Sequence, residues 1–429
     1  MRPSIALAGL ATLLGVACTT IIDLPDLPDA PGGAGTSATG SAGTGATRGG
    51  AASAAGTGAA EMGDAGSTGA GEGGESSGGS SNGGSSAGGS PNAGSSTGGS
   101  STGGTAVQGM CPSDRKLCGD MCADLTSDKD HCGDCETKCD GCSLSRCYTV
   151  LVPTRVWFFA VNASHVYFAE TGNVARVPRA GGAVQVLSQS EAPAAIAIDQ
   201  ANVYWIDKAS SAATLRKVPL AGGTGQQLAT GIWASSIAVD ASYVYASVDD
   251  SGGSGTGSIV KVPVAGGAAV TLAPAQLNNG PLAIDSTYVY WANLGDGTER
   301  HNTDGSVMRV PKAGGSVVTL AANVDGPRSL VLANNSVYFG NWDSIQKVPT
   351  TTGAVSTVTT TTGATALAAD GSSIYACGTA ELKPLLQLSL AGVEQSTLAA
   401  TGEARPIVVD GSTVFWSDST SLNSIAKMP

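Results

Sequence analysis

The sequence predicts an all-β fold: a seven-bladed β-propeller closed by an N-terminal strand, preceded by a disordered Gly/Ser-rich tether and a small disulfide-rich module. Three observations predict this. A strand–turn–strand pattern with a central aromatic pair recurs seven times at the period of a four-stranded blade. The segment before the repeats contains eight closely spaced cysteines. The segment before those is almost entirely Gly, Ser, Ala and Thr.

The N-terminus is typical of an export signal, with a minimal basic start and an apolar run too short to span a bilayer. With small residues before Cys18, it resembles a bacterial lipoprotein signal, which implies that Cys18 becomes the lipid-modified first residue of the mature chain. An ordinary secretory signal cleaved near Ala17 is the alternative. Because Thr19 rather than Asp follows the cysteine, the resemblance implies the outer membrane or surface of a bacterial cell.

Residues 19–110 are expected to be a disordered linker, since so few large apolar side chains cannot offset the entropy of ordering. A Gly-rich coil of this length spans about 50 Å and would serve as a tether. The whole chain is acidic and poor in charge, with a net charge of −12 and 13% charged residues. It lacks the basic stripe that nucleic-acid binding needs, so we expect no nucleic-acid partner and membrane contact through the lipid alone.

A cysteine module occupies residues 111–147. In an exported chain, eight cysteines in so short a segment predict four disulfides, whose 105 possible pairings the sequence leaves open. Zinc is the alternative, because Cys132 and Cys135 have ligand spacing and His131 is adjacent. The segment resembles a short Cys-rich module that follows low-complexity leaders in bacterial surface proteins, which implies a spacer or docking piece. The eight cysteines are Cys111, Cys118, Cys122, Cys132, Cys135, Cys139, Cys142 and Cys147.

The propeller is expected over residues 148–429. Each copy contains an apolar strand, a tight turn, an aromatic strand, a polar loop, a strand ending near Val-Pro, a Gly-Gly turn and a last strand, with no helical period. An Asp usually opens the first turn, where its side chain can bond the backbone two residues on, so we interpret these aspartates as structural. The seven pairs that align the copies are Tyr167-Phe168, Tyr204-Trp205, Tyr245-Ala246, Tyr290-Trp291, Tyr338-Phe339, Tyr375-Ala376 and Phe415-Trp416.

The seventh copy ends one strand short, and one apolar segment before the first copy has no place of its own. A closed ring has no exposed sheet edges. We therefore predict that residues 149–152 pair with the strand around Ser424 to Lys427 and complete the last blade.

Three copies resemble the Tyr-Trp-Thr-Asp propellers of the low-density-lipoprotein-receptor type, most closely in Tyr204-Trp205-Ile206-Asp207. The resemblance implies a propeller and a role in protein binding, because most members bind proteins. Those propellers usually have six blades, so only the blade architecture carries over. The aromatic residues are interpreted as blade packing, since they recur in copy after copy.

Two long loops after the second strands of the third and fourth copies are acidic and, as neighbours, are expected to form a shared lip on one face. Carboxylate oxygens on flexible loops suit Ca²⁺, which is the one cofactor the sequence suggests; ordinary solvated loops are the alternative. The candidate residues are Asp249, Asp250, Asp296, Glu299, His301 and Asp304.

Nothing in the sequence resembles a nucleophile elbow, a P-loop or a metalloprotease helix. We therefore expect a noncatalytic, monomeric binding or scaffold protein of the cell surface, with a protein or glycan partner. The alternative is a propeller lyase or hydrolase, because streptogramin lyases have a similar repeat style. Cys377, outside the module, is expected to be a buried thiol that packs as a small apolar residue.

Overall fold

The computed structural model describes residues 111–208, 212–249, 255–277, 279–295, 303–360, 362–378, 384–400 and 406–428. The predicted signal, the lipidation site and the linker lie outside these residues. The described residues contain strands and no helix.

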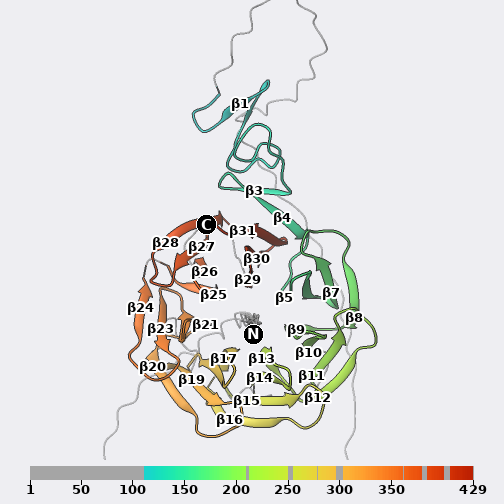
Figure 1. The fold of residues 1–429 in the computed structure, drawn as a ribbon, viewed down its shortest axis with the longest axis vertical. Helices are drawn as coiled ribbons and strands as arrows, with labels where there is room; N and C mark the ends of the chain where they lie inside the picture. Colours follow the sequence, from blue (N-terminus) through green and yellow to red (C-terminus); the bar gives the residue numbers. More distant parts are fainter. Residues whose placement is uncertain are drawn as a thin grey trace, which may run out of the picture. The chain divides into compact units, whose positions relative to one another are not determined.

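Seven antiparallel sheets stand around a common axis, and each is one blade of a propeller (Figure 1). From the axis outward, blades 1 to 3 are β5 (Phe158–Val161), β6 (His165–Glu170), β7 (Gly172–Pro178) and β8 (Gln185–Ser190); β9 (Pro193–Ile198), β10 (Asn202–Asp207), β11 (Thr214–Pro219) and β12 (Gln226–Thr230); and β13 (Ala234–Val239), β14 (Tyr243–Asp249), β15 (Thr256–Pro263) and β16 (Val270–Leu277). Blades 4 to 6 are β17 (Asn279–Ile284), β18 (Tyr288–Asn293), β19 (Gly305–Pro311) and β20 (Val318–Val324); β21 (Ser329–Ala333), β22 (Ser336–Gly340), β23 (Ile345–Pro349) and β24 (Ser356–Thr359); and β25 (Ala364–Ala369), β26 (Ser373–Gly378), β27 (Pro384–Ser389) and β28 (Glu394–Ala400).

Blade 7 combines both ends of the propeller, as predicted. Its strands are β29 (Ile407–Asp410), β30 (Thr413–Ser417), β31 (Leu422–Ala426), β4 (Arg146–Val152) and β3 (Gly141–Ser143), in that order. Inner strand β29 contacts β5 of blade 1, so the circuit of inner strands closes. The seven-bladed fold class is therefore confirmed.

Two details of the closure differ from the prediction. The register pairs Leu422 with Val152 and Ser424 with Thr149, so β4 binds the start of β31 and not the stretch up to Lys427. Lys427 lies beyond the strand, where its side chain reaches Asp370 in blade 6. The closing strand β4 also begins at Arg146, inside the predicted cysteine module. There it forms a hairpin with β3, which adds a fifth strand to the sheet.

The aromatic residues of the repeat fill the space between and within blades. Trp205, Trp291 and Trp416 are fully buried, as are Tyr204 and Tyr290. This agrees with the interpretation of the aromatic pairs as blade packing. Cys377 is buried in the same way, in a cluster with apolar residues of blades 6 and 7, and is in none of the four disulfides.

The repeated aspartates hold turns, as predicted, and they also bind a repeated tyrosine. In four blades Oδ1 of the aspartate accepts the backbone N–H groups two and three residues on, while Oδ2 accepts the hydroxyl of the strand tyrosine at 2.7–3.2 Å. Burial raises the pKa of each of these tyrosines, and the neighbouring carboxylate raises it further. The pairs are Asp199 with Tyr204, Asp240 with Tyr245, Asp285 with Tyr290, and Asp370 with Tyr375.

The turn between the first two strands of blade 5 has no aspartate and is instead a two-residue hairpin turn. Ala333 and Ser336 are paired directly, and the two residues between them, Asn334 and Asn335, have φ of 43° and 57°. Two consecutive positive φ angles are what the tight turn of a β-hairpin requires, and Asn tolerates them better than most residues.

The basic residue of each Lys/Arg-Val-Pro segment joins neighbouring blades. Its side chain donates a hydrogen bond to a backbone carbonyl of the following blade, for example Lys217 Nζ to Val264 O at 2.7 Å and Lys261 Nζ to Lys312 O at 2.7 Å. Charged residues directly after this segment, and the residue at the equivalent position of blade 7, instead pair with a turn aspartate of the preceding blade. These ion pairs are Arg179 with Asp410 at 2.5 Å, Lys312 with Asp240 at 2.9 Å and Lys427 with Asp370 at 2.6 Å.

Candidate functional site

One face of the ring collects the variable loops of the protein. In an antiparallel blade, the end at which the inner strand starts is also the end at which the second strand finishes. The loops before the inner strands and after the second strands therefore emerge together, and we call this side the loop face. The predicted acidic lip belongs to it, since Asp249 ends β14 and Asp304 directly precedes β19.

The axis of the ring offers little chemistry. Within their described bounds, the seven inner strands contain a single ionisable side chain, Asp410, at the end of β29 that lies away from the loop face. Its carboxylate is engaged by Arg179 of blade 1. The other positions are mainly Ala, Val, Leu, Ile, Phe and Ser. Small and apolar side chains along the axis provide no convergent set of acids and bases.

Tryptophan and arginine gather on the loop face instead. Trp157, directly before β5, has half of its surface exposed, and the guanidinium of Arg155 lies 3.7 Å from the centre of its ring. In blade 5 the guanidinium of Arg328 lies 4.7 Å from the centre of the Trp342 ring. Trp233, directly before β13, is partly buried at the same end of blade 3. The loop face thus presents aromatic surface in three blades, twice with a cation stacked on it.

These residues could not be predicted from the aromatic pairs of the repeat. Trp157, Trp233 and Trp342 lie outside those pairs, and each stands at the loop-face end of an inner or second strand. Their position could have indicated a function, because a tryptophan outside the repeated pattern is not explained by the packing that all blades share.

A second feature of the loop face is the presence of two partly buried opposite charges, Lys208 of blade 2 and Asp249 of blade 3, which influence each other electrostatically. Burial raises the pKa of Asp249, and the nearby Lys208 opposes this rise. Burial lowers the pKa of Lys208, and Asp249 opposes that in turn. The two groups are therefore held with their pKa values displaced toward each other, a condition that is frequent at functional sites. The sequence analysis named Asp249 and missed Lys208, which directly follows β10.

The predicted acidic lip is only partly within the described residues. Asp249 is half-buried, and Asp304, one blade further on, is exposed. Asp250, Asp296, Glu299 and His301 lie outside the described residues, so the lip and its Ca²⁺ site stay a prediction.

The cysteine module forms four disulfides among its eight cysteines. They are Cys111–Cys122, Cys118–Cys135, Cys132–Cys142 and Cys139–Cys147. A short sheet of β1 (Lys116–Cys118) and β2 (Met121–Ala123) is its other regular structure besides the β3–β4 hairpin. The disulfide-rich module predicted as part of the fold class is confirmed.

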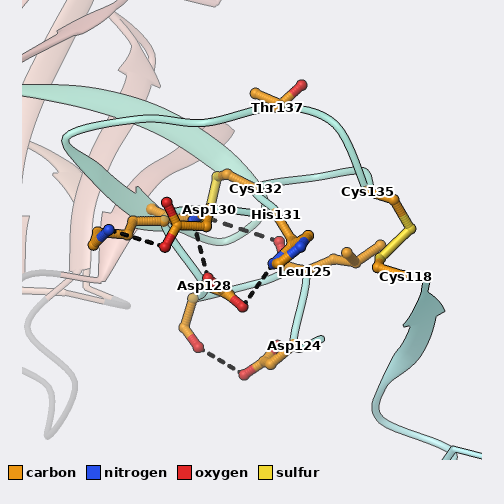
Figure 2. Close-up of polar contacts among 12 residues, drawn as sticks. Cys118, Asp124, Leu125, Asp128, Asp130, His131, Cys132, Cys135 and Thr137 are labelled. Atoms are coloured by element: carbon orange, nitrogen blue, oxygen red, sulfur yellow. Dashed lines mark hydrogen bonds and ion pairs between the residues drawn. A yellow bond between two sulfur atoms is a disulfide. The ribbon is translucent and has the colours of Figure 1, made fainter. Parts of the chain in front are cut away.

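The zinc alternative is not the arrangement in the structure. Figure 2 shows Cys135 bonded to Cys118, while Cys132 lies apart with its own disulfide. His131 Nδ1 lies 3.0 Å from Oδ2 of Asp128, so this ring nitrogen is already paired with a carboxylate. With both cysteines oxidised, neither offers the thiolate that zinc needs.

The aspartates of the module serve its own turns. Asp124 accepts hydrogen bonds from the hydroxyls of Ser127 and Thr126 and from the backbone N–H of Thr126, which lower its pKa to about 2. Asp134 likewise accepts the backbone N–H groups of Glu136 and Thr137. Such local bonds take the place of a hydrophobic core in a segment this short.

Cys18 lies outside the described residues, so lipidation stays a prediction. Among the residues that the structure does describe, no helix has the length and apolar character needed to cross a bilayer.

No protein-family profile matches the chain, and no curated protein matches its sequence. Solved structures do match its fold. A GH74 enzyme of Niastella koreensis superposes with a TM-score of 0.50 at 12% identity, over 64% of this chain and 53% of that one. The chain shares the β-propeller fold with this protein. At 12% identity the likeness establishes the fold alone.

Two further solved structures match with lower TM-scores. A chain of the nidogen/laminin complex matches with a TM-score of 0.41 at 15% identity, over 55% of this chain and 93% of that one. PorZ, a bacterial surface component of the type-IX secretion system of Porphyromonas gingivalis, matches with a TM-score of 0.45 at 11% identity, over 66% of this chain and 39% of that one. At these TM-scores the similarity carries no functional argument.

Proposed function

We propose that the protein is a noncatalytic binding or scaffold protein of the bacterial cell envelope, whose propeller binds a protein or glycan through its loop face. The observation that carries this proposal is the contrast between the axis of the ring and the aromatic residues of the loop face around it. Within their described bounds, the inner strands that line the axis bear no ionisable side chain at their loop-face ends, whereas Trp157 is half exposed beside Arg155. Tryptophan and arginine are the residues most enriched among binding hot spots.

The arrangement of the chain supports a displayed binding domain. A lipid on Cys18 would hold the N-terminus at a membrane, and the linker of residues 19–110 would let the propeller sample about 50 Å from it. The disulfides of the module suit an oxidising compartment outside the cytoplasm. The repeats also resemble those of low-density-lipoprotein-receptor-type propellers, most of which bind proteins.

The test compares variants on opposite faces of the ring. The full mature chain is immobilised and exposed to envelope proteins and to a panel of surface glycans, and each ligand that binds is measured again with Arg155→Ala/Trp157→Ala and with Val393→Ser. Val393 is exposed and lies in the turn before β28, on the face opposite the loop face. We expect the loop-face variant to bind at least ten times more weakly and the Val393 variant to bind normally. Equal binding by all three chains would place the partner elsewhere and contradict the proposal.

A lyase or hydrolase is the second candidate, and the Lys208–Asp249 pair favours it. A lysine with a lowered pKa and a nearby carboxylic acid with a raised one have pKa values closer together than usual, which favours proton exchange between them. If the bound ligand is turned over, Lys208→Met should abolish turnover while leaving binding within about twofold. Turnover that survives Lys208→Met would exclude this pair as the acid–base group.

A further inference from the structure

Two disulfides of the module lie against each other. Cys132 is bonded to Cys142, and Cys139 is bonded to Cys147. Nevertheless the sulfur atoms of Cys132, Cys139 and Cys147 all lie within 4.8 Å of one another. One bond is therefore within exchange distance of a sulfur of the other, because thiol–disulfide exchange requires only that a thiolate reach a neighbouring disulfide sulfur.

A second pairing of the same four cysteines fits the backbone. Cys142 and Cys147 are direct partners across the β3–β4 hairpin. Directly opposite residues in an antiparallel pair have Cα atoms about 4.5–5.5 Å apart, which is within the range that a disulfide spans. Cys132 and Cys139 already have neighbouring sulfurs. The alternative set Cys132–Cys139 and Cys142–Cys147 thus needs side-chain rotation rather than a new backbone fold.

The Cys139–Cys147 bond is open to solvent. Cys147 is exposed, and both cysteines line a cavity of about 600 Å³ between β4, the 138–140 segment and the turn after β7. An incoming thiol can therefore reach Cys147 Sγ from the cavity. Cys132, by contrast, is buried at 3% exposure while its partner Cys142 is partly exposed, so the Cys132 sulfur is shielded from an incoming thiol and is reached through Cys139.

A lysine lies close to this bond in the sequence and in the cavity. Lys138 directly precedes Cys139 and lines the cavity, as does Arg179, which is paired with Asp410. One acid, Asp140, lines the cavity and is exposed. A nearby ammonium such as that of Lys138 stabilises the thiolate of Cys139 and makes it a better leaving group in exchange.

We propose that Cys139–Cys147 is an exchange-active disulfide that reacts with thiols and rearranges with Cys132–Cys142. A thiolate attacks Cys147 Sγ, forming a mixed disulfide there and releasing Cys139 as the thiolate. Cys139 then attacks Cys132 Sγ, which forms Cys132–Cys139 and releases the Cys142 thiolate. Cys142 attacks Cys147 Sγ, which forms Cys142–Cys147 and expels the original thiolate. The thiol is regenerated, and no net oxidation or reduction occurs.

The rearrangement changes how the module is joined to the propeller. In the present pairing both bonds connect the segment from Cys132 to Cys139 with the β3–β4 hairpin, which is part of blade 7. After exchange, one bond closes within that segment and the other within the hairpin. No disulfide then crosses the joint, and the chain around Asp140 is the one covalent connection left between the rest of the module and the propeller. A thiol in the surroundings would thereby loosen the attachment of the propeller to its tether.

The test uses the full mature chain without oxygen, incubated with a small amount of reduced glutathione and then quenched with N-ethylmaleimide. Disulfides are assigned by mass spectrometry of proteolytic peptides. We expect Cys132–Cys139 and Cys142–Cys147 to appear, with Cys139–Cys147 lost at least ten times faster than the internal control Cys111–Cys122. In a chain carrying Cys132→Ser and Cys142→Ser together, glutathione should instead accumulate on Cys147. Unchanged pairing, or loss of Cys139–Cys147 no faster than the control bond, would overturn the proposal.

Discussion

Truncation of Leu151 tests the contribution of the borrowed strand to the propeller. Leu151 lies on β4, is 4% exposed and packs in a cluster with Phe159 of blade 1 and Leu422 of blade 7. Leu151→Ala removes three buried carbon atoms, a transfer loss of about 2.4 kcal/mol at about 0.8 kcal/mol each. The unfilled space adds to this, so we expect the free energy of unfolding to fall by about 3 kcal/mol, within the usual range of about 2–5 kcal/mol.

The assay is urea and thermal unfolding of the full mature chain, followed by circular dichroism. A loss of about 3 kcal/mol should lower Tm by about 6–10 °C for a domain of this size. Leu187→Ala is the matched comparison, because Leu187 is 5% exposed on β8, the outer strand of a blade built from consecutive strands. Val186→Ala, at an exposed position of the same strand, should change the free energy by less than about 1 kcal/mol.

Equal costs for Leu151→Ala and Leu187→Ala would mean that β4 is as much a part of its blade as β8. The opposite outcome is that Leu151→Ala unfolds like Val186→Ala while Leu187→Ala is clearly destabilised. In that case β4 would contribute nothing to the folded ring.

Three further predictions concern charge, anchoring and the buried thiol. Burial raises the pKa of Asp240, but hydrogen bonds from Lys312 and two backbone N–H groups outweigh burial and lower the pKa below its ordinary value of 3.8. The ionised carboxylate therefore stabilises the fold above pH 3.8, and this stabilisation is lost as the pH falls through the lowered pKa. The Asp240→Asn protein should therefore have a lower free energy of unfolding in urea at pH 7, and the difference between its free energies of unfolding at pH 7 and pH 3 should be smaller than in the wild type. An unchanged difference would contradict this. Cys18→Ser should move the protein from the membrane to the soluble fraction, and a wild-type protein already in the soluble fraction would contradict lipidation. Cys377, at 1% exposure, should react with a thiol reagent only after unfolding, and rapid labelling of the native chain would contradict its burial.

The architecture was predictable because it repeats. Seven copies of one pattern average out the ambiguity of any single strand, and the missing fourth strand of the last copy identifies the closing segment by elimination. The Asx turns were predictable for the same reason, since Asp199 and its counterparts recur at a position where one side-chain bond explains them.

The register of the closing blade was not predictable to the residue. Lys427 stands in a Lys-Met-Pro sequence that resembles the Lys-Val-Pro of other copies, but it occupies the position of Lys312 and forms the same kind of ion pair. Strand pairing is decided by which side chains become buried across the ladder, and here Ser424 faces Thr149. The contribution of β3 was hidden as well, because the cysteines around it indicated a separate module.

The candidate site was the least predictable part. Lys208 and Asp249 are far apart in the chain and belong to different blades, so their mutual effect on pKa follows from the folded ring alone. Arg155 and Trp157 are neighbours in sequence, yet their exposure depends on β5 beginning directly after them. Side chains that do not repeat carry no periodic signal, and function resides in such residues.

Hydrogen–deuterium exchange along blade 7 measures whether strands from both ends of the propeller form one sheet. If the two ends of the propeller form one sheet, peptides that cover β4 should be as protected from exchange as peptides that cover β30 in the same blade, because both are paired within blade 7. Protection of β4 and β31 should also disappear together under mild denaturation. Exchange of residues 149–152 at the rate of exposed loops, with β30 and β31 still protected, would contradict the closed seven-bladed ring.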